Sequence, residues 1–413
     1  MRKPFPCASV SCLALIVSVT WTLPNGANAA PWDPAAADYS GHRGKTIYVS
    51  KLGDNTDGST WQKAFRTIQA ALLAVPDEQG GHRVVVRPDT YAEAVLYPAR
   101  TGARGAYNLL IGDSRGTLGS GATGRVILDA SCPGVAVRRD PKTLHKIVQS
   151  DLPETGFKSI DWWSNFLEGT SVQGRSADGA ELTMSCSTWD RWIFRDLYAT
   201  GGDAGLFWDI GDPGAGFTVV VEDCVGIGRA FGGGVCYPVA RPDEPSVFRR
   251  CYFLSLDWVG DAAAVLIGGS EKSMPDHPHL VMEDCTMVHA DNALAISYAS
   301  HCARAKLTGC RLIVLNFTQP EMNGDKNATG ILCTQQGPAQ PGRLHVDLED
   351  CTLAGYSVFT PGADAKAVTY TTKGRVQAYV QYRQPLPDGF QRLGLWPAEL
   401  FDRIAPPQAG PSQ

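Results

Sequence analysis

Residues 280–287 read Leu-Val-Met-Glu-Asp-Cys-Thr-Met, and this pattern recurs along the chain. The copies, aligned on one residue that we call the anchor, are Val219 to Gly226, Ser246 to Phe253, Leu280 to Met287, Ala305 to Leu312, Val346 to Leu353 and Trp192 to Ala199. Their anchors are Cys224, Cys251, Cys285, Cys310, Cys351 and, in the last copy, Leu197. Small or apolar residues stand five and three positions before the anchor, at it, and two after it. This period of two predicts strands with one buried face.

The alternation breaks once in each copy, at the two residues before the anchor. They are the polar pairs Glu222-Asp223, Glu283-Asp284 and Glu349-Asp350 in three copies. A polar pair that breaks the alternation predicts a corner between two short strands. A third apolar run follows each corner after a turn, at Leu206 to Ile210, Val235-Cys236, Val265 to Ile267, Leu294 to Ile296 and Ile331 to Cys333.

Successive anchors lie 27, 27, 34, 25 and 41 residues apart, which is typical of stacked structural repeats. Each repeat is then one coil of three strands, and neighbouring coils pair along a common axis about 4.8 Å apart. We therefore predict an all-β fold, a right-handed parallel β-helix. A β-sandwich is the alternative, but the hairpin signals that join sandwich strands are missing.

The ends of a β-helix expose strand edges that need covers. A strand is expected at Thr46 to Ser50, followed by a turn at residues 54–58 that resembles a calcium loop but lacks its distal Glu, so we interpret it as a plain turn. An amphipathic helix is expected next, capped by Ser59 or Thr60, with Val84 to Val86 entering the first coils. The apolar face of this helix is Trp61, Ala64, Phe65, Ile68, Ala71, Leu72 and Val75.

The predicted organisation has four parts. They are a signal peptide at 1–29, a linker at 30–45, a β-helix domain at 46–385 and a C-terminal tail at 386–413. The domain includes the N-terminal cap at 46–80 and an irregular insertion at 132–185. The signal peptide is read from basic Arg2-Lys3, an apolar stretch from Val10 to Leu23 and a small-residue cleavage site at Ala27-Asn28-Ala29.

Export predicts a secreted, periplasmic or cell-surface protein, with no membrane span once the leader is removed. The formal net charge of −5 comes without a concentrated basic face, so nucleic acid is not expected as a partner. We expect a monomer.

Stacked cysteines in register have parallel Cα–Cβ vectors and Cβ atoms about 4.8 Å apart, beyond the roughly 3.5 to 4.5 Å of a disulfide. We interpret the anchor cysteines as buried thiols. Pairing among Cys132, Cys186, Cys236, Cys302 and Cys333 stays open, and no zinc-ligand spacing occurs.

The N-terminal region resembles the cap of the pectin lyase-like superfamily. The matching residues are Tyr48-Val49-Ser50, Gly53-Asp54, Asp57-Gly58, Phe65, Thr67 to Leu72 and Val86 to Tyr91. The resemblance implies a parallel β-helix, a fold shared by glycoside hydrolases, polysaccharide lyases, esterases and proteins without known activity. It therefore names a fold and not a reaction.

The segments Glu283 to Met287 and Asp291 to Ile296 resemble a coil of the polygalacturonases. In that alignment Asp291 takes the place of the general acid, and Asn292 stands where the family has a second aspartate. The family's Asn-Thr-Asp, Gly-His-Gly and Arg-Ile-Lys elements are not found. Membership in that enzyme family is therefore not expected.

Carboxylates gather on one predicted edge of the stack without reference to any family. Asp203, Asp257 and Asp291 each lie six positions after an anchor, and Asp261 precedes the run Val265 to Ile267. Adjacent coils bring such carboxyl groups into the roughly 5 to 9.5 Å range that glycosidases use. Asp is also a favoured turn residue, so a structural role at these positions is the alternative.

We predict catalytic roles for Asp291, Asp261 and Asp257. Asp209, Phe207, His289 and Asn292 are candidates for substrate contact, because an aromatic ring beside polar groups suits a sugar. A lyase would instead use a base such as Lys or His, with calcium as a possible cofactor; candidates are Lys272, His277, His279, His289 and His301. No other cofactor and no metal are predicted. Arg249 and Arg250 are expected to form surface ion pairs of little energetic weight with neighbouring Glu-Asp corners.

The resulting hypothesis is a secreted carbohydrate-active protein that hydrolyses glycosidic bonds of a polysaccharide by paired-carboxylate catalysis. The alternatives are a uronate lyase and a glycan-binding or structural surface protein without catalysis. The glycan and its linkage do not follow from the sequence.

Overall fold

The structure is a computed structural model, and it describes residues 44–93, 96–130, 189–206, 218–232, 235–236, 241–255, 263–267, 272–289, 293–296, 302–314, 330–334, 342–355, 357–359, 367–380 and 386–393. The expected signal peptide, the insertion at 132–185 and most of the tail lie outside these residues. In the described part, no helix has the length and apolar character that a bilayer span requires.

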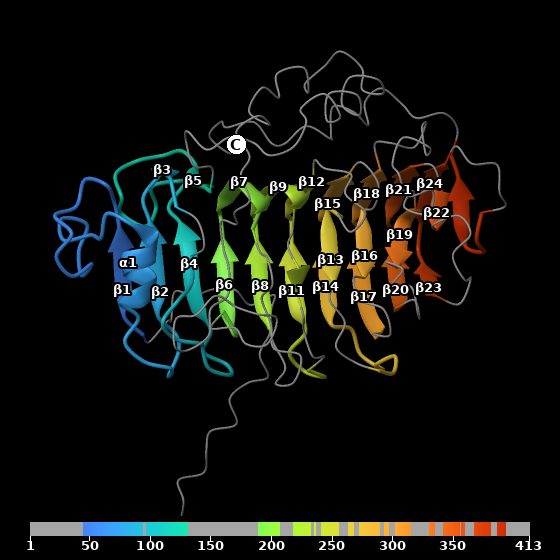
Figure 1. Ribbon diagram of the computed structural model, residues 1–413, viewed down its shortest axis with the longest axis horizontal. Helices are drawn as coiled ribbons and strands as arrows, with labels where there is room; N and C mark the ends of the chain where they lie inside the picture. Colours follow the sequence, from blue (N-terminus) through green and yellow to red (C-terminus); the bar gives the residue numbers. More distant parts are fainter. Residues whose placement is uncertain are drawn as a thin grey trace, which may run out of the picture.

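The chain winds through three parallel sheets, and the coils stack along one axis (Figure 1). The first sheet consists of β1 (Thr46–Val49), β2 (Arg83–Val86), β4 (Asn108–Gly112), β6 (Trp192–Arg195), β8 (Val219–Glu222), β11 (Ser246–Arg249), β14 (Leu280–Glu283), β17 (Cys302–Thr308), β20 (Arg343–Glu349) and β23 (Val368–Lys373). The second sheet consists of β3 (Asp89–Tyr91), β5 (Val126–Asp129), β7 (Tyr198–Ala204), β9 (Val225–Phe231), β12 (Tyr252–Ser255), β15 (Thr286–His289), β18 (Arg311–Val314), β21 (Thr352–Gly355), β24 (Val376–Val380) and β25 (Phe390–Arg392). The third sheet consists of β10 (Val235–Cys236), β13 (Val265–Ile267), β16 (Leu294–Ile296), β19 (Gly330–Thr334) and β22 (Ser357–Phe359). The third sheet has described strands only from β10 onward. The predicted right-handed parallel β-helix is confirmed.

The register follows the anchors. Met282, three residues before its anchor, pairs with Phe248 in the preceding coil and with Leu307 in the next. These side chains belong to one continuous interior cluster that runs from Ile47 in the first coil to Ala378 near the C-terminal end. The predicted third runs form the third sheet, except that only Leu206 of the run Leu206 to Ile210 is described.

The corners between the first and second sheets share one backbone conformation. The residue before each anchor has positive φ, 53° at Asp223, 49° at Arg250, 53° at Asp284 and 66° at Gly309. A single left-handed residue turns the chain from one sheet into the next. Asp and Gly suit this position because they tolerate left-handed backbone better than most residues.

The anchor cysteines are free, buried thiols, as predicted. In four of them, Cys251, Cys285, Cys310 and Cys351, the Sγ atom donates to a carbonyl of the preceding coil, three residues before that coil's own anchor. Cys285 donates to Phe248 O at 3.3 Å, and Cys310 donates to Met282 O at 3.5 Å. Burial raises the pKa of both thiols well above the ordinary range. Cys302 and Cys333 are also free and buried.

A column of alternating charge runs beside the corners, two residues before the anchors. Arg195 binds Glu222 at 2.5 Å, and Arg249 binds both Glu222 at 2.8 Å and Glu283 at 2.6 Å. The Arg249 and Glu222 side chains are only 6% and 2% exposed. The expectation that Arg249 forms a surface pair was therefore wrong, because adjacent coils cover it. The Arg250–Asp223 pair is exposed as expected.

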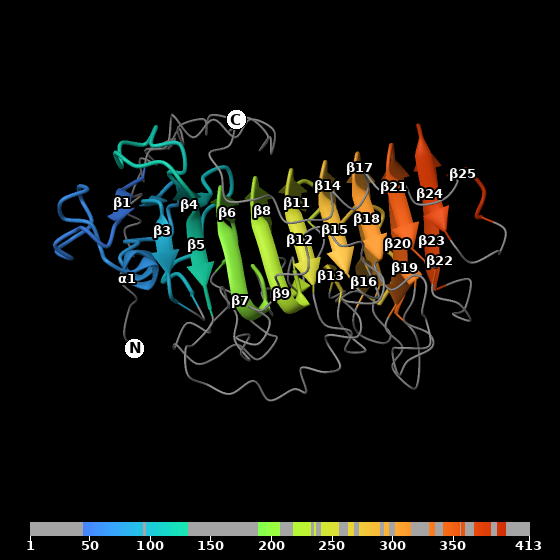
Figure 2. The same ribbon diagram turned by 90° about the horizontal axis from the view of Figure 1, so that it is seen from above.

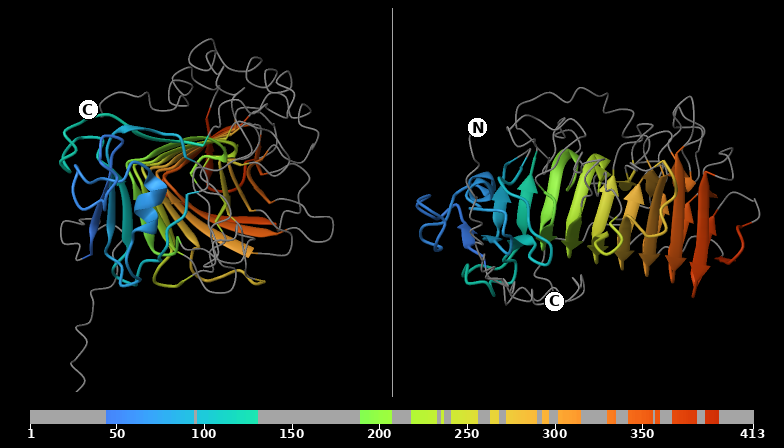
Figure 3. Two further views of the ribbon diagram at one scale, coloured as in Figure 1. Left: turned by 60° about the vertical axis from the view of Figure 1, so that its left-hand side comes forward. Right: turned by 90° about the horizontal axis from the view of Figure 1, so that it is seen from below.

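The N-terminal end is covered by α1 (Ile68–Leu73), seen at the mouth of the solenoid in Figure 3, with Ile68, Ala71 and Leu72 buried against the core. The capping helix was predicted, but not its start. Its N-cap is Thr67, whose side chain accepts from Ala70 N, rather than Ser59 or Thr60. The stretch before it is not helical, because Phe65 pairs with Val49 and extends the edge of the first sheet.

The turn at residues 54–58 uses its polar side chains on its own backbone. Asp54 accepts from Thr56 N and Asp57 accepts from Ser59 N, both at 2.9 Å. The Asn55 side chain accepts from Arg66 N at 3.0 Å. These contacts fit the plain turn that was predicted.

The C-terminal end extends the sheets beyond the anchored copies. A further coil, β23 and β24, turns at Gly374 and has Arg375 where other coils have cysteine. β25 then pairs with β24, inside the segment assigned to the tail (Figure 2).

The buried thiols predict a labelling pattern. In the native protein, Cys224, Cys251, Cys285, Cys310 and Cys351 will not react with iodoacetamide, because they are buried and, for thiols such as Cys285, the thiolate is disfavoured. After unfolding in guanidinium chloride all five will react. Peptide mass mapping of the alkylated protein measures both states, and alkylation of native Cys285 would contradict the stacking.

The charge column predicts unequal effects of two adjacent arginines. Arg249→Ala leaves the buried Glu222 with Arg195 as its remaining partner and will lower the free energy of unfolding by about 1 to 3 kcal/mol. Arg250→Ala removes an exposed pair and serves as the matched control, with a loss below about 1 kcal/mol. Urea unfolding followed by circular dichroism tests the difference, and equal losses would refute it.

Candidate functional site

Most residues that the sequence nominated for catalysis or substrate contact fall outside the described part of the chain. These are Asp257, Asp261, Asp291, Asn292, Asp209 and Phe207. The strands that follow two of them are described. Asp261 lies four residues before Val265 in β13, and Asp291 lies three residues before Leu294 in β16. Val265 and Leu294 are direct partners in the third sheet.

The outer face of the third sheet is covered at β13. Val265 and Ile267 belong to the interior cluster, so the side chain of Leu266 points outward. Leu266 is nevertheless only 3% exposed. The middle of β13 therefore offers no open surface to a ligand.

Two histidines considered from the sequence are buried. His289 ends β15, shares the inward face of Cys285 and Met287, and has no exposed surface. His279 precedes β14, and its Nδ1 accepts from Arg304 N at 3.1 Å. Burial lowers the pKa of His279 to about 4. Contact between either imidazole and a ligand requires the surrounding side chains to move.

A second candidate region, which sequence reasoning missed, lies at a corner of the N-terminal coils. β4 and β5 are joined by residues 113–125, which we call the corner loop, where later coils turn through one left-handed residue. The loop leans over the corners of the next coils. Gly112 permits this approach, because a Cβ there would lie 2.2 Å from the carbonyl oxygen of Asp196.

Asp113 holds the corner loop in shape. Its side chain is buried, and its two oxygens accept from Leu118 N at 2.8 Å and from Ser120 N at 2.9 Å. The loop closes where Gly124 N donates to Ser114 O at 2.9 Å. These bonds give the loop a fixed geometry before any ligand arrives.

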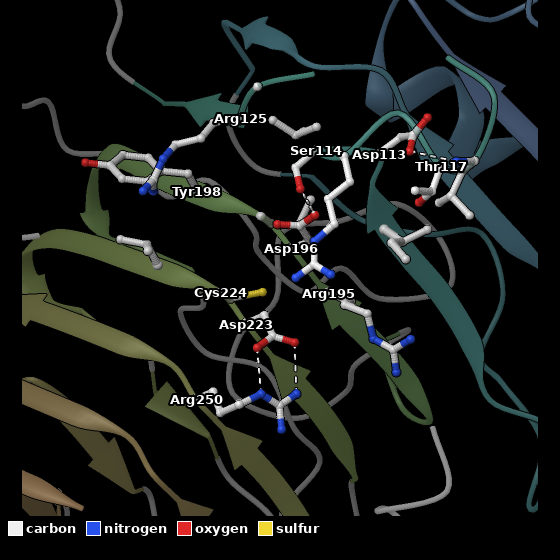
Figure 4. A pocket seen from close by; sticks show the side chains of 18 of the residues that line it. Asp113, Ser114, Thr117, Arg125, Arg195, Asp196, Tyr198, Asp223, Cys224 and Arg250 are labelled. Atoms are coloured by element: carbon white, nitrogen blue, oxygen red, sulfur yellow. Dashed lines mark hydrogen bonds and ion pairs between the residues drawn. The ribbon is translucent and has the colours of Figure 1, made fainter. Parts of the chain in front are cut away.

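The corner loop and the corners below it enclose a cavity of about 530 Å³, the corner cavity (Figure 4). Its lining comes from the coils of β4, β6, β8 and β11. The charged residues in it are Asp113, Arg115, Arg125, Arg195, Asp196, Asp223 and Arg250. Tyr198 and Tyr252 add aromatic surface, and Ser114 and Thr117 add hydroxyl groups.

Asp196 is the corner residue of its coil and lies under the corner loop, with Ser114 Oγ donating to its carboxyl group. Burial raises the pKa of this carboxyl, and the neighbouring Asp223 raises it further, while the Ser114 hydrogen bonds and the charge of Arg115 act in the opposite direction. Asp223, on the next coil, binds Arg250 through both oxygens at 2.7 and 2.9 Å.

A further arginine side chain lies on the aromatic side of the corner cavity. The Arg125 guanidinium lies 5.0 Å from the centre of the Tyr198 ring, a cation–π arrangement seen in Figure 4. Chemically, the corner cavity thus combines guanidinium groups, hydroxyl groups and carboxyl groups, and the pKa of the Asp196 carboxyl is raised by burial. Within the described residues, no group of three His, Cys, Asp or Glu side chains is arranged to hold a metal ion.

The corner loop left a trace in the sequence. Residues 112–124 contain Gly112, Gly116, Gly119, Gly121 and Gly124. Such a run of glycines between two strands indicates a structured turn-rich loop. It was missed because its coil has no cysteine anchor, so no alignment placed it at a corner.

No protein-family model matches the chain, and no similar curated protein is found. Among solved structures, pectate lyase Pel9A is similar with a TM-score of 0.47 and 14% identity, covering 84% of this chain and 74% of that one. Pectin methylesterase from Aspergillus niger has a TM-score of 0.36 and 13% identity, with coverage of 80% and 85%. Pectin methylesterase PemA from Erwinia chrysanthemi has a TM-score of 0.37 and 12% identity, with coverage of 84% and 92%. At these values the activity of this chain has to be argued from its own residues.

The raised pKa of Asp196 predicts a sign for its pH-linked contribution to stability. Between the unfolded and the folded pKa, the native state holds more protons than the unfolded state, so stability falls as pH rises. Relative to Asp196→Asn, the wild-type protein will therefore be more stable at pH 4 than at pH 7. Urea denaturation of both proteins at the two pH values measures this difference, and a difference of the opposite sign would contradict the burial of Asp196.

Proposed function

We propose that the chain is an exported enzyme that hydrolyses glycosidic bonds of a polysaccharide, acting as a monomer through carboxyl groups between the second and third sheets. The pairing of strands in neighbouring coils supports this proposal. β12 pairs with β15, and β13 pairs with β16. The segments that connect them are thus bracketed at both ends by hydrogen-bonded neighbours.

Both connecting segments carry carboxyl groups. Asp257 and Asp261 fall between β12 and β13, and Asp291 falls between β15 and β16. Neighbouring strands lie about 4.8 Å apart, so side chains from adjacent coils can span the roughly 5 to 9.5 Å between the two carboxyl groups of a glycosidase. The pairing of β12 with β15 and of β13 with β16 is the observation on which the proposal rests.

The roles follow from the chemistry of glycoside hydrolysis. Asp291 is the proposed general acid, which protonates the leaving oxygen, and Asp261 or Asp257 is the carboxylate that activates water or attacks the sugar. Asn292, Asp209 and Phe207 are proposed to contact the sugar rings. His289 would support the site from beneath, because its side chain is buried.

The lyase and the non-catalytic glycan-binding protein are the alternatives, and they predict different products. A lyase leaves an unsaturated sugar that absorbs in the ultraviolet, and calcium then assists by holding the uronate carboxylate. A binding protein releases no product.

The proposal predicts the effect of one substitution. Asp291→Asn will lower the rate of reducing-end release about 100-fold or more, because general acid catalysis contributes about 10² to 10⁴, while the melting temperature changes little. Rates are measured on a panel of neutral and uronate-containing polysaccharides, together with ultraviolet absorbance.

Asp388→Asn is the matched control, since Asp388 is exposed near β25 at the far end of the solenoid and should leave the rate unchanged. Full activity in Asp291→Asn would overturn the assignment. A large loss of stability in that variant would favour a structural turn role for Asp291.

A further inference from the structure

We infer that the corner cavity is a binding site for a saccharide that carries a carboxylate, separate from the proposed catalytic carboxyl groups. The sugar character of the ligand rests on the proposed function, whereas the preference for an anion rests on the arginines alone. The corner cavity is lined from the first and second sheets, and the proposed catalytic residues flank the third.

The size and the rigidity of the corner cavity both suit a ligand-binding site. Its volume of about 530 Å³ lies within the roughly 300 to 1,000 Å³ of small-molecule sites. The corner loop is fixed by the Asp113 bonds to Leu118 N and Ser120 N. A site whose walls are already ordered loses little conformational entropy when a ligand binds.

The acidic side chains of the corner cavity already have hydrogen-bond partners within the protein. Asp223 is held by Arg250 through two hydrogen bonds, and Asp113 is held by two backbone N–H groups. Asp196 accepts from Ser114, and burial favours its neutral form. These three carboxyl groups therefore do not require a bound cation.

The lining of the corner cavity contains four arginines and three aspartates. Arg195 is engaged by Glu222 at 2.5 Å, but Arg115 is exposed and makes no ion pair or hydrogen bond with the residues that the structure describes. Arg115 nevertheless lies close enough to Asp196 to influence its charge. Its guanidinium can turn toward an anion in the corner cavity, and guanidinium binds carboxylate through two parallel hydrogen bonds.

The remaining lining suits the body of a sugar. Ser114 and Thr117 offer hydroxyl groups, and the carboxyl of Asp196 can exchange hydrogen bonds with sugar hydroxyls. Tyr198 offers an aromatic ring, whose centre lies 5.0 Å from the Arg125 guanidinium. Together these groups favour a polyhydroxylated anion over a simple inorganic ion.

Calorimetric titration tests the inference. The probes are a galacturonic acid trisaccharide, the corresponding neutral galactose trisaccharide and sodium phosphate, and all titrations use the Asp291→Asn background so that no cleavage interferes. The uronate trisaccharide should bind at least 10-fold more tightly than either other probe. Arg115→Ala should weaken its binding at least 10-fold, and Arg115→Lys should restore part of the loss.

Arg375→Ala is the matched control, because Arg375 is an exposed arginine beside the corresponding corner of a C-terminal coil, and it should leave binding unchanged. Hydrogen exchange should show protection of residues 113–125 by the uronate. Equal binding of the neutral sugar or of phosphate, unchanged binding in Arg115→Ala, protection elsewhere, or no binding at all would each overturn the inference.

The catalytic proposal and the binding-site proposal can be refuted independently of each other. Loss of cleavage in Asp291→Asn bears only on the catalytic carboxyl groups, since binding at the corner loop is measured in that same variant. Binding that depends on Arg115 would stand even if no polysaccharide were cleaved.

Discussion

The strands that the structure describes pair with strands of neighbouring coils. Arg311 N donates to Cys285 O and Thr352 N donates to Cys310 O, and the same step repeats along the axis. A coil that shifted by one residue would turn its inward side chains outward, so the register is fixed jointly by the backbone bonds and by burial. The anchor cysteines, the left-handed corners and the column of alternating charge are all consequences of this fixed register.

The register also explains why similar residues have different environments. Arg249 and Arg250 are adjacent in sequence, yet one is enclosed between neighbouring coils and the other lies at the exposed corner. Likewise, Asp196 and Asp223 occupy equivalent corners, but only Asp196 lies beneath Ser114 of the corner loop. One insertion between β4 and β5 thus turns a structural position into part of a cavity.

The fold was predictable because its strongest signal is local and repeated. A small residue at the anchor and apolar residues five and three positions before it identified β6 to β21 and their corners. The coil that turns at Gly374 has Arg375 in place of the anchor cysteine, so it gave no alignment and was missed. The helix start was wrong because the apolar spacing of Trp61 and Phe65 also suits a strand edge, and only the pairing with Val49 decides between them. The burial of Arg249 and the corner cavity depend on neighbours distant in sequence, which no local pattern reveals.

The column of buried thiols sets a condition on how this protein matures. In the folded chain the Sγ atoms of Cys251, Cys285, Cys310 and Cys351 each donate to a carbonyl of the preceding coil. Cβ atoms stacked about 4.8 Å apart are too distant for a disulfide. The unfolded chain has the same cysteines without these constraints. In an oxidising compartment, stacking of the coils and oxidation of the thiols therefore compete, and a crosslink that forms first would hold two anchors in a geometry that the finished solenoid excludes. In such a compartment the order of these two events affects how much of the chain becomes native.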